Sequence, residues 1–235
     1  MPVIKHFPEW VSFKAELDSY VRLSPGRRRE FVFRGQADSR WELRASLDRN
    51  STFTSEVDRE SCLKALINCF TQEVSGVDAS LSFKTETEWE MLGRHHGLPT
   101  SLLDWTQSPF VGAYFAFADS APADAECASV WMFDRDMFAT RVLPEIEVID
   151  NEQLNRFNPR AIEQRGLFLQ IKRAATSLEE LLADHLVRYD IPLSERQFVL
   201  ADLDEMLINS RKLFRDLDGA ARSAMNRVLV LGETK

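Results

Sequence analysis

Cysteine and histidine are scarce in this sequence. Three cysteines (Cys62, Cys69 and Cys127) and four histidines occur among 235 residues, and no CxxC spacing is present. An odd number of cysteines without such spacing does not fit a disulfide framework or a cysteine-based zinc site. We therefore expect reduced thiols, a cytoplasmic location and no bound metal.

Long apolar runs and the common catalytic motifs are also missing. No run approaches the roughly 18 residues of a membrane-spanning helix, and the first ten residues lack the apolar core of a signal peptide. The sequence contains no P-loop, GxGxxG, HExxH or GxSxG pattern. These absences argue against a membrane protein, a P-loop nucleotidase, a Rossmann dehydrogenase, a zinc protease and a serine hydrolase.

An excess of positive charge is lacking as well. The formal net charge is −8, which argues against binding to a long nucleic-acid duplex. A local basic patch, such as the run Arg27–Arg29, leaves contact with a nucleic-acid end open. The sequence does not indicate an oligomeric state.

The composition that remains is that of a globular protein rich in aromatic residues. Hydrophobic residues make up 44% of the chain, and 16 Phe and 5 Trp are present, enough for a sizeable aromatic core. No internal repeat, low-complexity tract or linker interrupts it. We predict a single domain over residues 1–235 of the α+β class, with helices around a central mixed or antiparallel sheet of short strands.

Hydrophobic periodicity and capping residues locate the elements. Helices are predicted at about 9–21, 56–74, 86–95, 110–118, 194–207 and after 219, with starts at Ser55, Thr85 or Thr87, Ser108-Pro109 and Ser194. Strands are predicted at 31–36, 128–133, 166–171 and 185–191, and at 41–43 as the hairpin partner of 31–36.

Residues 94–117 (RHHGLPTSLLDWTQSPFVGAYFAF) combine polar and apolar groups unusually closely. Five polar side chains lie in a strongly hydrophobic context: His95, His96, Thr100, Asp104 and Thr106. Buried polar groups need partners, so this stretch predicts either a hydrogen-bonded core junction or a pocket with a polar floor. His95 and His96 are adjacent and would point apart on a regular element.

Arg34 follows an apolar strand pattern and precedes a glycine. Gly35 would let a ligand or another backbone approach closely. The planar guanidinium of arginine suits phosphate or carboxylate. A structural salt bridge from Arg34 to Asp104 or to a glutamate is the alternative.

Four stretches together resemble the FRG domain family, named for its Phe-Arg-Gly motif. They are FVFRGQADSRWELRASLDR, RHHGLPTSLLDWTQSPFVGAYFAF, NPRAIEQRGLF and YDIPLSERQFVLADLDEMLINSRKLFRDLDG. The similarity runs from about Phe13 to Leu229. It implies a role for Arg34, Gly35, Gln36, His95, His96, Gly97, Pro99, Thr100, Leu103, Asp104, Trp105, Thr106 and Gln164. We expect Gln at position 94 and Arg at position 101 in the family, where this chain has Arg94 and Ser101.

A second, weaker similarity is to ADP-ribosyltransferases of the Arg-Ser-Glu type, and it implies a related core fold with NAD as cofactor. Phe33-Arg34-Gly35 resembles their first motif. The second is matched by Thr106-Gln107-Ser108-Pro109 with the following helix, or by Thr100-Ser101. Their third motif is a catalytic glutamate, which would hold the ribose and stabilise an oxocarbenium-like transition state. Gln164 stands at the matching position and is uncharged, Glu163 is adjacent, and Glu145 and Glu147 are alternatives.

These resemblances lead to three functional hypotheses. In the first, the protein is an ADP-ribosyltransferase-like or NAD-processing enzyme, with Arg34, Thr106, Gln164 and Glu163 as its catalytic residues. The expected cofactor-binding residues are Gly35, Gln36, Arg44, His95, His96, Thr100 and Asp104. In the second, it is a non-catalytic module that binds a nucleotide or a nucleic-acid end through Arg34, Arg44 and the 27–29 run. In the third, His96, Asp104 and Trp105 form a hydrogen-bonded core and the surface binds a protein partner. The family resemblance also implies a bacterial setting in defence against phage.

Overall fold

The computed structural model describes residues 1–22, 31–50, 53–78, 81, 83, 85–136, 143–149, 163–173 and 177–232. A seven-stranded sheet with the order β1-β7-β4-β2-β3-β6-β5 forms its centre. β1 is parallel to β7, and the other neighbouring strands are antiparallel. The strands are β1 (Val3–His6), β2 (Phe31–Gln36), β3 (Leu102–Thr106), β4 (Cys127–Asp134), β5 (Ile146–Ile149), β6 (Gly166–Ile171) and β7 (Leu186–Pro192). The predicted α+β class with a mixed sheet is confirmed.

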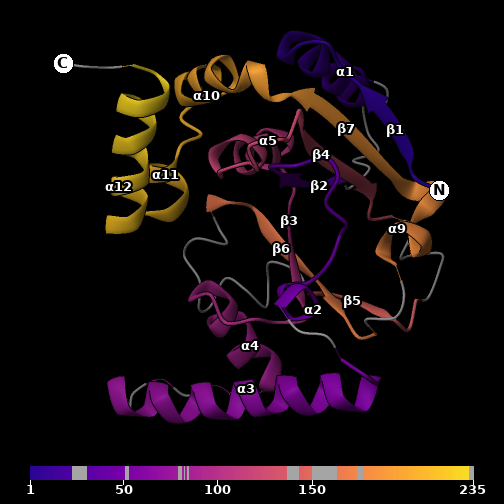
Figure 1. The fold of residues 1–235 in the computed structure, drawn as a ribbon, viewed down its shortest axis with the longest axis vertical. Helices are drawn as coiled ribbons and strands as arrows, with labels where there is room; N and C mark the ends of the chain where they lie inside the picture. Colours follow the sequence, from indigo (N-terminus) through magenta and orange to yellow (C-terminus); the bar gives the residue numbers. More distant parts are fainter. Residues whose placement is uncertain are drawn as a thin grey trace.

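Helices surround this sheet. α1 and α10 lie near one end of the molecule, α3 and α4 lie at the other, and α11 and α12 stand together along one side (Figure 1). Their bounds are α1 (Trp10–Arg22), α2 (Ser46–Asn50), α3 (Glu56–Val77), α4 (Glu86–His95), α5 (Pro109–Ala118), α9 (Leu178–Leu181), α10 (Arg196–Glu205), α11 (Ser210–Phe214) and α12 (Leu217–Met225). Short 3-10 turns occupy Ala183–His185 and Leu193–Glu195, and a π-helical turn follows α12 at Asn226–Val230.

Fewer residues pair between β2 and β3 than between the strands on either side of them. β2 pairs with β4 over six residues, and β3 pairs with β6 over five, from Leu102 to Thr106. β2 and β3 share a single pair, Phe33 with Thr106. A four-strand half (β1-β7-β4-β2) therefore meets a three-strand half (β3-β6-β5) along a short junction, which we call the seam.

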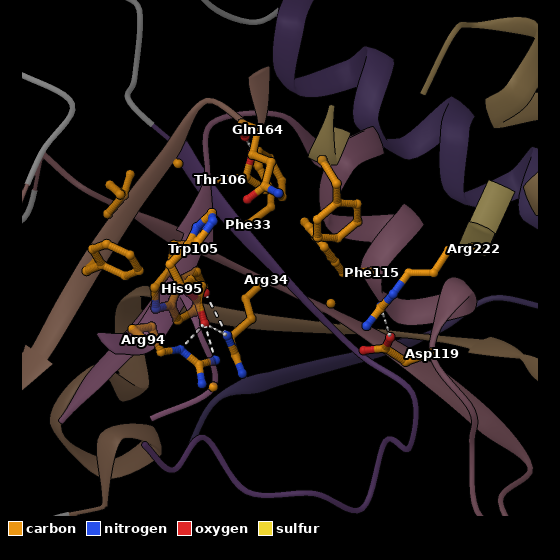
Figure 2. A pocket seen from close by; sticks show the side chains of 17 residues that line it. Phe33, Arg34, Arg94, His95, Trp105, Thr106, Phe115, Asp119, Gln164 and Arg222 are labelled. Carbon is orange, nitrogen blue, oxygen red and sulfur yellow. Dashed lines mark hydrogen bonds and ion pairs between the residues drawn. The ribbon is translucent and has the colours of Figure 1, made fainter. Parts of the chain in front are cut away.

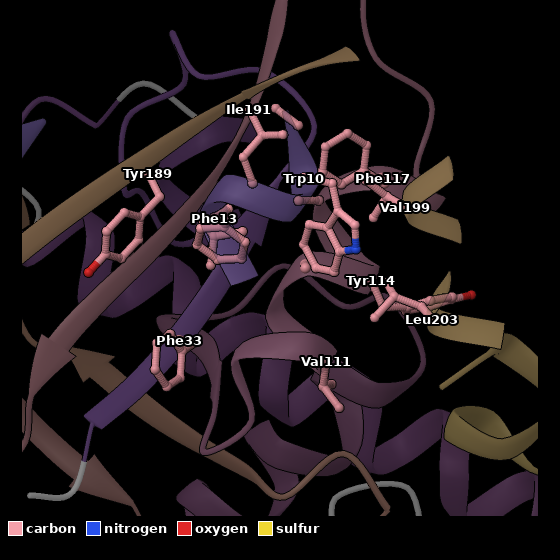
Figure 3. Packing of buried hydrophobic residues seen from close by; sticks show 14 of the residues in the cluster. Trp10, Phe13, Phe33, Val111, Tyr114, Phe117, Tyr189, Ile191, Val199 and Leu203 are labelled. Atoms are coloured by element: carbon pink, nitrogen blue, oxygen red, sulfur yellow. The ribbon is translucent and has the colours of Figure 1, made fainter. Parts of the chain in front are cut away.

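An aromatic core lies between the four-strand half and the helices α1 and α5 (Figure 3). Trp10 and Phe13 from α1 pack with Phe33, Phe117 and Tyr189, all of them buried. The Phe13 and Tyr189 rings meet edge to face with centroids 5.4 Å apart. Each such side chain contributes roughly 1.5–3 kcal/mol on burial, so this cluster fixes α1 and α5 on the sheet.

The glycine of the Phe-Arg-Gly motif is needed for the packing of α5 on β2. A Cβ at Gly35 would lie 2.0 Å from the Gly112 carbonyl oxygen and 2.4 Å from the Ala116 nitrogen, both backbone atoms. A side chain at Gly112 would in turn meet the Cβ of Phe33 at 3.1 Å. The close approach expected at Gly35 is therefore made by the backbone of α5.

Most element predictions are confirmed, because they depended on local signals. Ser55, Thr85 and Ser108 cap α3, α4 and α5, each accepting a backbone N–H of the first turn. The Thr85 cap forms a full capping box with Glu88. Gly97, at a φ of +87°, ends the α4 segment as expected of a glycine in the left-handed region.

Two local predictions are wrong. Residues 41–43 form no strand, because β3 and β4 occupy both edges of β2 and leave no place for a hairpin partner. Ser194 does not cap α10, which begins at Arg196 after a 3-10 turn and has no side-chain cap. Strands β1, β3 and β5 were not predicted. The Arg27–Arg29 run lies outside the described residues.

Candidate functional site: a cleft at the seam

A cleft of about 390 Å³ opens where β2 and β3 diverge. Residues 33–35 of β2 and 104–106 of β3 line it, together with the end of α4, the start of β6, α5 and the C-terminal helices. This volume lies in the range of roughly 300–1,000 Å³ that is usual for small-molecule sites. The single-pair junction of the two sheet halves therefore coincides with a cleft of the size of a small-molecule site.

Arg34 crosses the seam with its side chain. Its Nη1 donates to the Asp104 carbonyl oxygen at 2.7 Å and lies 3.6 Å from the Asp104 carboxylate. Arg94, from α4, donates to the same carboxylate through Nε at 3.1 Å and Nη2 at 2.5 Å. Figure 2 shows Arg34 and Arg94 side by side at one end of the cleft. The salt bridge to Asp104 that was the alternative for Arg34 is present, and Arg34 also lines the cleft.

This end of the cleft carries an excess of positive charge. Arg49 of α2 adds a third guanidinium close enough to interact electrostatically with Arg34, Arg94 and Asp104. Burial lowers the pKa of Arg34 to about 10, and repulsion from Arg94 and Arg49 adds to this effect against the attraction of Asp104. Partial burial and Arg94 also lower the pKa of Arg49. Three cations therefore face one carboxylate, and all three remain charged at neutral pH.

Asp104 is held ionised within this cluster. Burial opposes its charge, but Arg94 and Arg34 hold the pKa of the carboxyl below its usual value. The Asp104 side chain is 45% exposed, so it faces the open cleft. The buried Nε of Arg34 has no hydrogen-bond partner among the described residues.

Thr106 and Gln164 meet on the wall of the cleft. The Thr106 hydroxyl donates to the Gln164 carbonyl oxygen at 2.6 Å and accepts the Ser108 N–H at 3.1 Å. The side-chain amide of Gln164 donates to the Leu213 carbonyl oxygen at 3.2 Å. Arg165 adopts a φ of +46°, a strained conformation for a residue with a side chain, which turns the chain between Gln164 and β6. Gln164 thereby ties β3 to α11.

The opposite end of the cleft is aromatic. Phe115 of α5 and Phe214 of α11 meet edge to face with ring centroids 6.1 Å apart. The Arg222 guanidinium of α12 lies 5.5 Å from the Phe214 ring centroid and 3.8 Å from the Asp119 carboxylate. Arg222 and Asp119 face one another across the mouth, far from Arg34 and Arg94 in Figure 2.

The cleft brings together some of the predicted site residues. Arg34, Gly35, His95, Asp104, Thr106 and Gln164 line it. His95 contributes from the end of α4, and its ring lies 5.0 Å from that of His96. His96 is exposed and does not line the cleft, but the two rings meet edge to face and do not point apart as expected.

Other predicted residues lie elsewhere, with internal partners. Gln36 is buried, where it accepts the indole N–H of Trp131 at 2.6 Å. Arg44 is exposed and pairs with Glu42 at 2.6 Å. Thr100 is fully buried and its backbone N–H donates to Ser46.

The predicted glutamates do not line the cleft. Glu163 pairs with Arg215 at 2.7 Å, and Glu147 pairs with Lys172 at 2.7 Å. Glu145 lies in the turn before β5, and its backbone carbonyl oxygen accepts the Lys172 N–H. The carboxylates that line the cleft are Asp104 and Asp119.

Sequence reasoning missed four lining residues. Arg94 was noted only as a departure from the family pattern, and Asp119, Phe214 and Arg222 were not noted at all. No local motif marks the last three, because they lie on α5, α11 and α12 and meet only after folding. The capping signal of Asp216, which accepts the Gly219 N–H at 2.7 Å, locates the start of α12 but not its position beside the cleft.

Neither a metal centre nor a membrane span is found among the described residues. No group of three or more His, Cys, Asp or Glu side chains in these ranges is arranged to hold a metal ion. No helix in the same part of the chain is long and apolar enough to cross a bilayer.

The comparisons with known proteins bear on the family and leave the activity open. The FRG domain family matches residues 29–125, a range that holds Arg34, Arg94, Asp104 and Thr106 but ends before Gln164 and α11. No curated protein and no solved structure matches the chain. The protein therefore carries an FRG domain, and the motif that names this family forms one wall of the cleft.

Proposed function

We propose that the cleft binds a nucleotide through its phosphate groups, with NAD as the first ligand to test. The observation that carries this proposal is the pair of cleft-lining guanidinium groups, Arg34 and Arg94, which share the Asp104 carboxylate with Arg49 nearby, in a protein whose formal net charge is −8. Like charges held this close repel each other, and a phosphate or pyrophosphate group would relieve that repulsion. Planar guanidinium groups also match phosphate oxygens in geometry.

A binding role is better supported than ADP-ribosyl transfer by a glutamate. Transferase chemistry requires a charge preorganised at the reacting carbon, and loss of such a group typically costs several kcal/mol of transition-state stabilisation. Glu163 is engaged with Arg215 outside the cleft, and Gln164 is uncharged and bonded to Leu213. The hydroxyl of Thr106 is likewise committed to internal hydrogen bonds.

Calorimetric titration of the full chain with NAD⁺, ADP and inorganic pyrophosphate tests the proposal. We expect all three to bind and Arg34→Lys to weaken each about tenfold, which corresponds to about 1.4 kcal/mol, because lysine loses the paired hydrogen bonds of the guanidinium. Arg94→Gln, which restores the residue expected in the family, should have a similar effect.

Arg44→Gln is the matched control, since it removes a guanidinium from a surface ion pair away from the cleft lining. Absence of binding heat with all three ligands would contradict the proposal. Equal affinities in Arg34→Lys and Arg44→Gln would contradict it as well.

A further inference from the structure

The C-terminal helices give the cleft a second subsite that differs chemically from the arginine cluster. Phe214 of α11 and Arg222 of α12 line the cleft with Phe115 and Asp119 of the α5 segment. α11 and α12 lie outside the FRG match at residues 29–125. This chain therefore completes the cleft with residues outside the matched range.

The position of this end is fixed by contacts with the rest of the site. Gln164, on the wall of the cleft, donates its side-chain amide to the Leu213 carbonyl oxygen, the residue before Phe214. Gly219 of α12 is packed so closely on α11 that a Cβ there would lie 2.8 Å from the Cβ of Phe214. Ser210, at the start of α11, is buried and hydrogen-bonds with the Tyr114 hydroxyl of α5. Phe214 is thus held beside Phe115 by α5, α12 and the loop before β6.

We propose that the Phe115–Phe214 end binds the planar heteroaromatic ring of the nucleotide, with Asp119 and Arg222 reading its polar edge. This inference rests on the proposed function, because it assigns the ring of the same ligand whose phosphates occupy the arginine cluster. Both rings are partly exposed and line the cleft, where the ring of a ligand can contact them. Stacking of a base on an aromatic side chain is favourable for every base, since each has a π face.

The Asp119–Arg222 pair at the mouth of the cleft supplies both a hydrogen-bond acceptor and hydrogen-bond donors. The Asp119 carboxylate accepts from an amino group, and the Arg222 guanidinium donates to a ring nitrogen or a carbonyl oxygen. Adenine, guanine and nicotinamide each carry a donor and an acceptor on one edge. At 3.8 Å and about 60% exposure, the Asp119–Arg222 pair is a loose surface contact that can open for a ligand at little cost.

The experiment separates the two ends of the ligand. Inorganic pyrophosphate, ribose 5-phosphate, ADP, GDP and NAD⁺ are titrated calorimetrically into the full chain, into Phe214→Leu and into Arg34→Lys. Phe214→Leu keeps an apolar side chain in contact with α12 but removes the ring. Phe198→Leu is the matched control, because Phe198 is an exposed phenylalanine on α10 outside the cleft. Melting temperatures establish that each variant is folded.

We expect Phe214→Leu to weaken ADP, GDP and NAD⁺ about tenfold and to leave pyrophosphate and ribose 5-phosphate unchanged. Arg34→Lys should weaken all five. Arg222→Gln, compared with Arg211→Gln on the exposed face of α11, should change the ratio of ADP to GDP affinity.

Three different outcomes would overturn the inference. If the nucleotides bind in an Arg34-dependent way but Phe214→Leu matches Phe198→Leu, the ring subsite is wrong and the phosphate site stands. If no phosphate-bearing ligand binds, both proposals fail. An equal loss of pyrophosphate and nucleotide affinity in Phe214→Leu would show that Phe214 only supports the cleft, and would also overturn the ring subsite.

Discussion

The two halves of the sheet on either side of the seam are stabilised in different ways. The four-strand half is held by aromatic packing, with Trp10, Phe13 and Tyr189 almost completely buried between helices and sheet. The three-strand half has its own apolar cluster, with Leu103, Leu167 and Leu169 buried, and adds contacts of buried charged groups. Arg59 of α3 is 2% exposed, and it binds Asp48 at 2.6 Å and the Ile171 carbonyl oxygen of β6 at 2.9 Å.

A second buried polar contact strengthens this contrast. Glu90 of α4 is 1% exposed and accepts hydrogen bonds from the Ser101 backbone N–H at 2.6 Å, the Ser101 hydroxyl at 2.7 Å and the Gln170 amide at 3.1 Å. Apolar packing tolerates approximate patterns, whereas buried charges require specific partners. The cleft lies at the seam between the two halves, where polar groups of the three-strand half meet aromatic side chains that pack on the four-strand half.

Removal of Arg59 should lower stability the most, because it removes the buried polar contacts of α3 with Asp48 and β6. Arg59→Ala leaves Asp48 partly buried without its partner and frees the Ile171 carbonyl oxygen, which we expect to lower the free energy of unfolding by about 3–5 kcal/mol. Urea unfolding measures this change. Arg44→Ala, which breaks an exposed ion pair, should change stability by less than about 1 kcal/mol. Equal losses in the two variants would contradict the role of burial.

Gly35→Ala should break the packing of the four-strand half. The added Cβ would lie 2.0 Å from a backbone oxygen of α5, so the helix must move away from β2. We expect a loss of about 3 kcal/mol of unfolding free energy. Gly76→Ala is the control: nothing lies within 4 Å of its Cβ, and alanine in α3 should stabilise by roughly 0.5–1 kcal/mol. Wild-type stability of Gly35→Ala would show that α5 is not held against β2 as described.

Gln36→Leu tests a polar contact inside the aromatic half. The variant leaves the buried indole N–H of Trp131 without its 2.6 Å acceptor. An unsatisfied buried donor costs about 1–3 kcal/mol, a smaller loss than for Arg59 because no charge is exposed to an apolar environment. The double variant Gln36→Leu with Trp131→Phe should recover part of the loss in the same unfolding experiment. Failure to recover would assign the effect to packing instead of the hydrogen bond.

The smallest expected effect is a contrast in pH dependence between two carboxyl groups of the three-strand half. Burial raises the pKa of Glu90 above its usual value, against the hydrogen bonds from Ser101 and Gln170. The folded state therefore binds a proton more readily than the unfolded chain at this position, and its contribution to stability is lost as pH rises through the folded pKa. Asp104 behaves oppositely: despite burial, Arg94 and Arg34 lower its pKa, so its contribution is lost as pH falls.

Unfolding free energies measured from about pH 3 to pH 8 reveal the two slopes, since unperturbed carboxyl groups titrate near pH 4. Glu90→Gln should flatten the loss of stability toward higher pH, and Asp104→Asn should flatten the loss toward lower pH. The same slope in both variants and in the parent chain would contradict the assignment.

Particular residues show why some features were predictable. Ser55, Thr85 and Ser108 cap helices through bonds within three residues of themselves, so the sequence contains everything that decides those starts. The strand at 31–36 was found from its residue types alone. The identity of its neighbouring strands was not, because the order of a sheet depends on how the strands pack in the fold. β3 and β4 occupy the two edges of β2, and residues 41–43 do not pair with it.

The candidate site divides in the same way. Arg34, Gly35, Asp104 and Thr106 were identified because motifs surround them, and the cleft includes all four. Gln36, Thr100 and His96 share the same motifs and lie outside the lining, because Gln36 and Thr100 are buried with internal partners and His96 is exposed at the surface. Phe214 and Arg222 line the cleft without any motif.

The sequence by itself determined the α+β class, the helix caps, the FRG motif and the need for glycine at position 35, because each depends on nearby residues or on one backbone contact. Only the tertiary structure decided that Arg34 and Arg94 share one carboxylate, that Glu163 pairs with Arg215 and that Phe214 of α11 meets Phe115 in the cleft. These contacts join residues 10 to 99 positions apart. Their energies depend on distance and burial, which the order of residues does not specify.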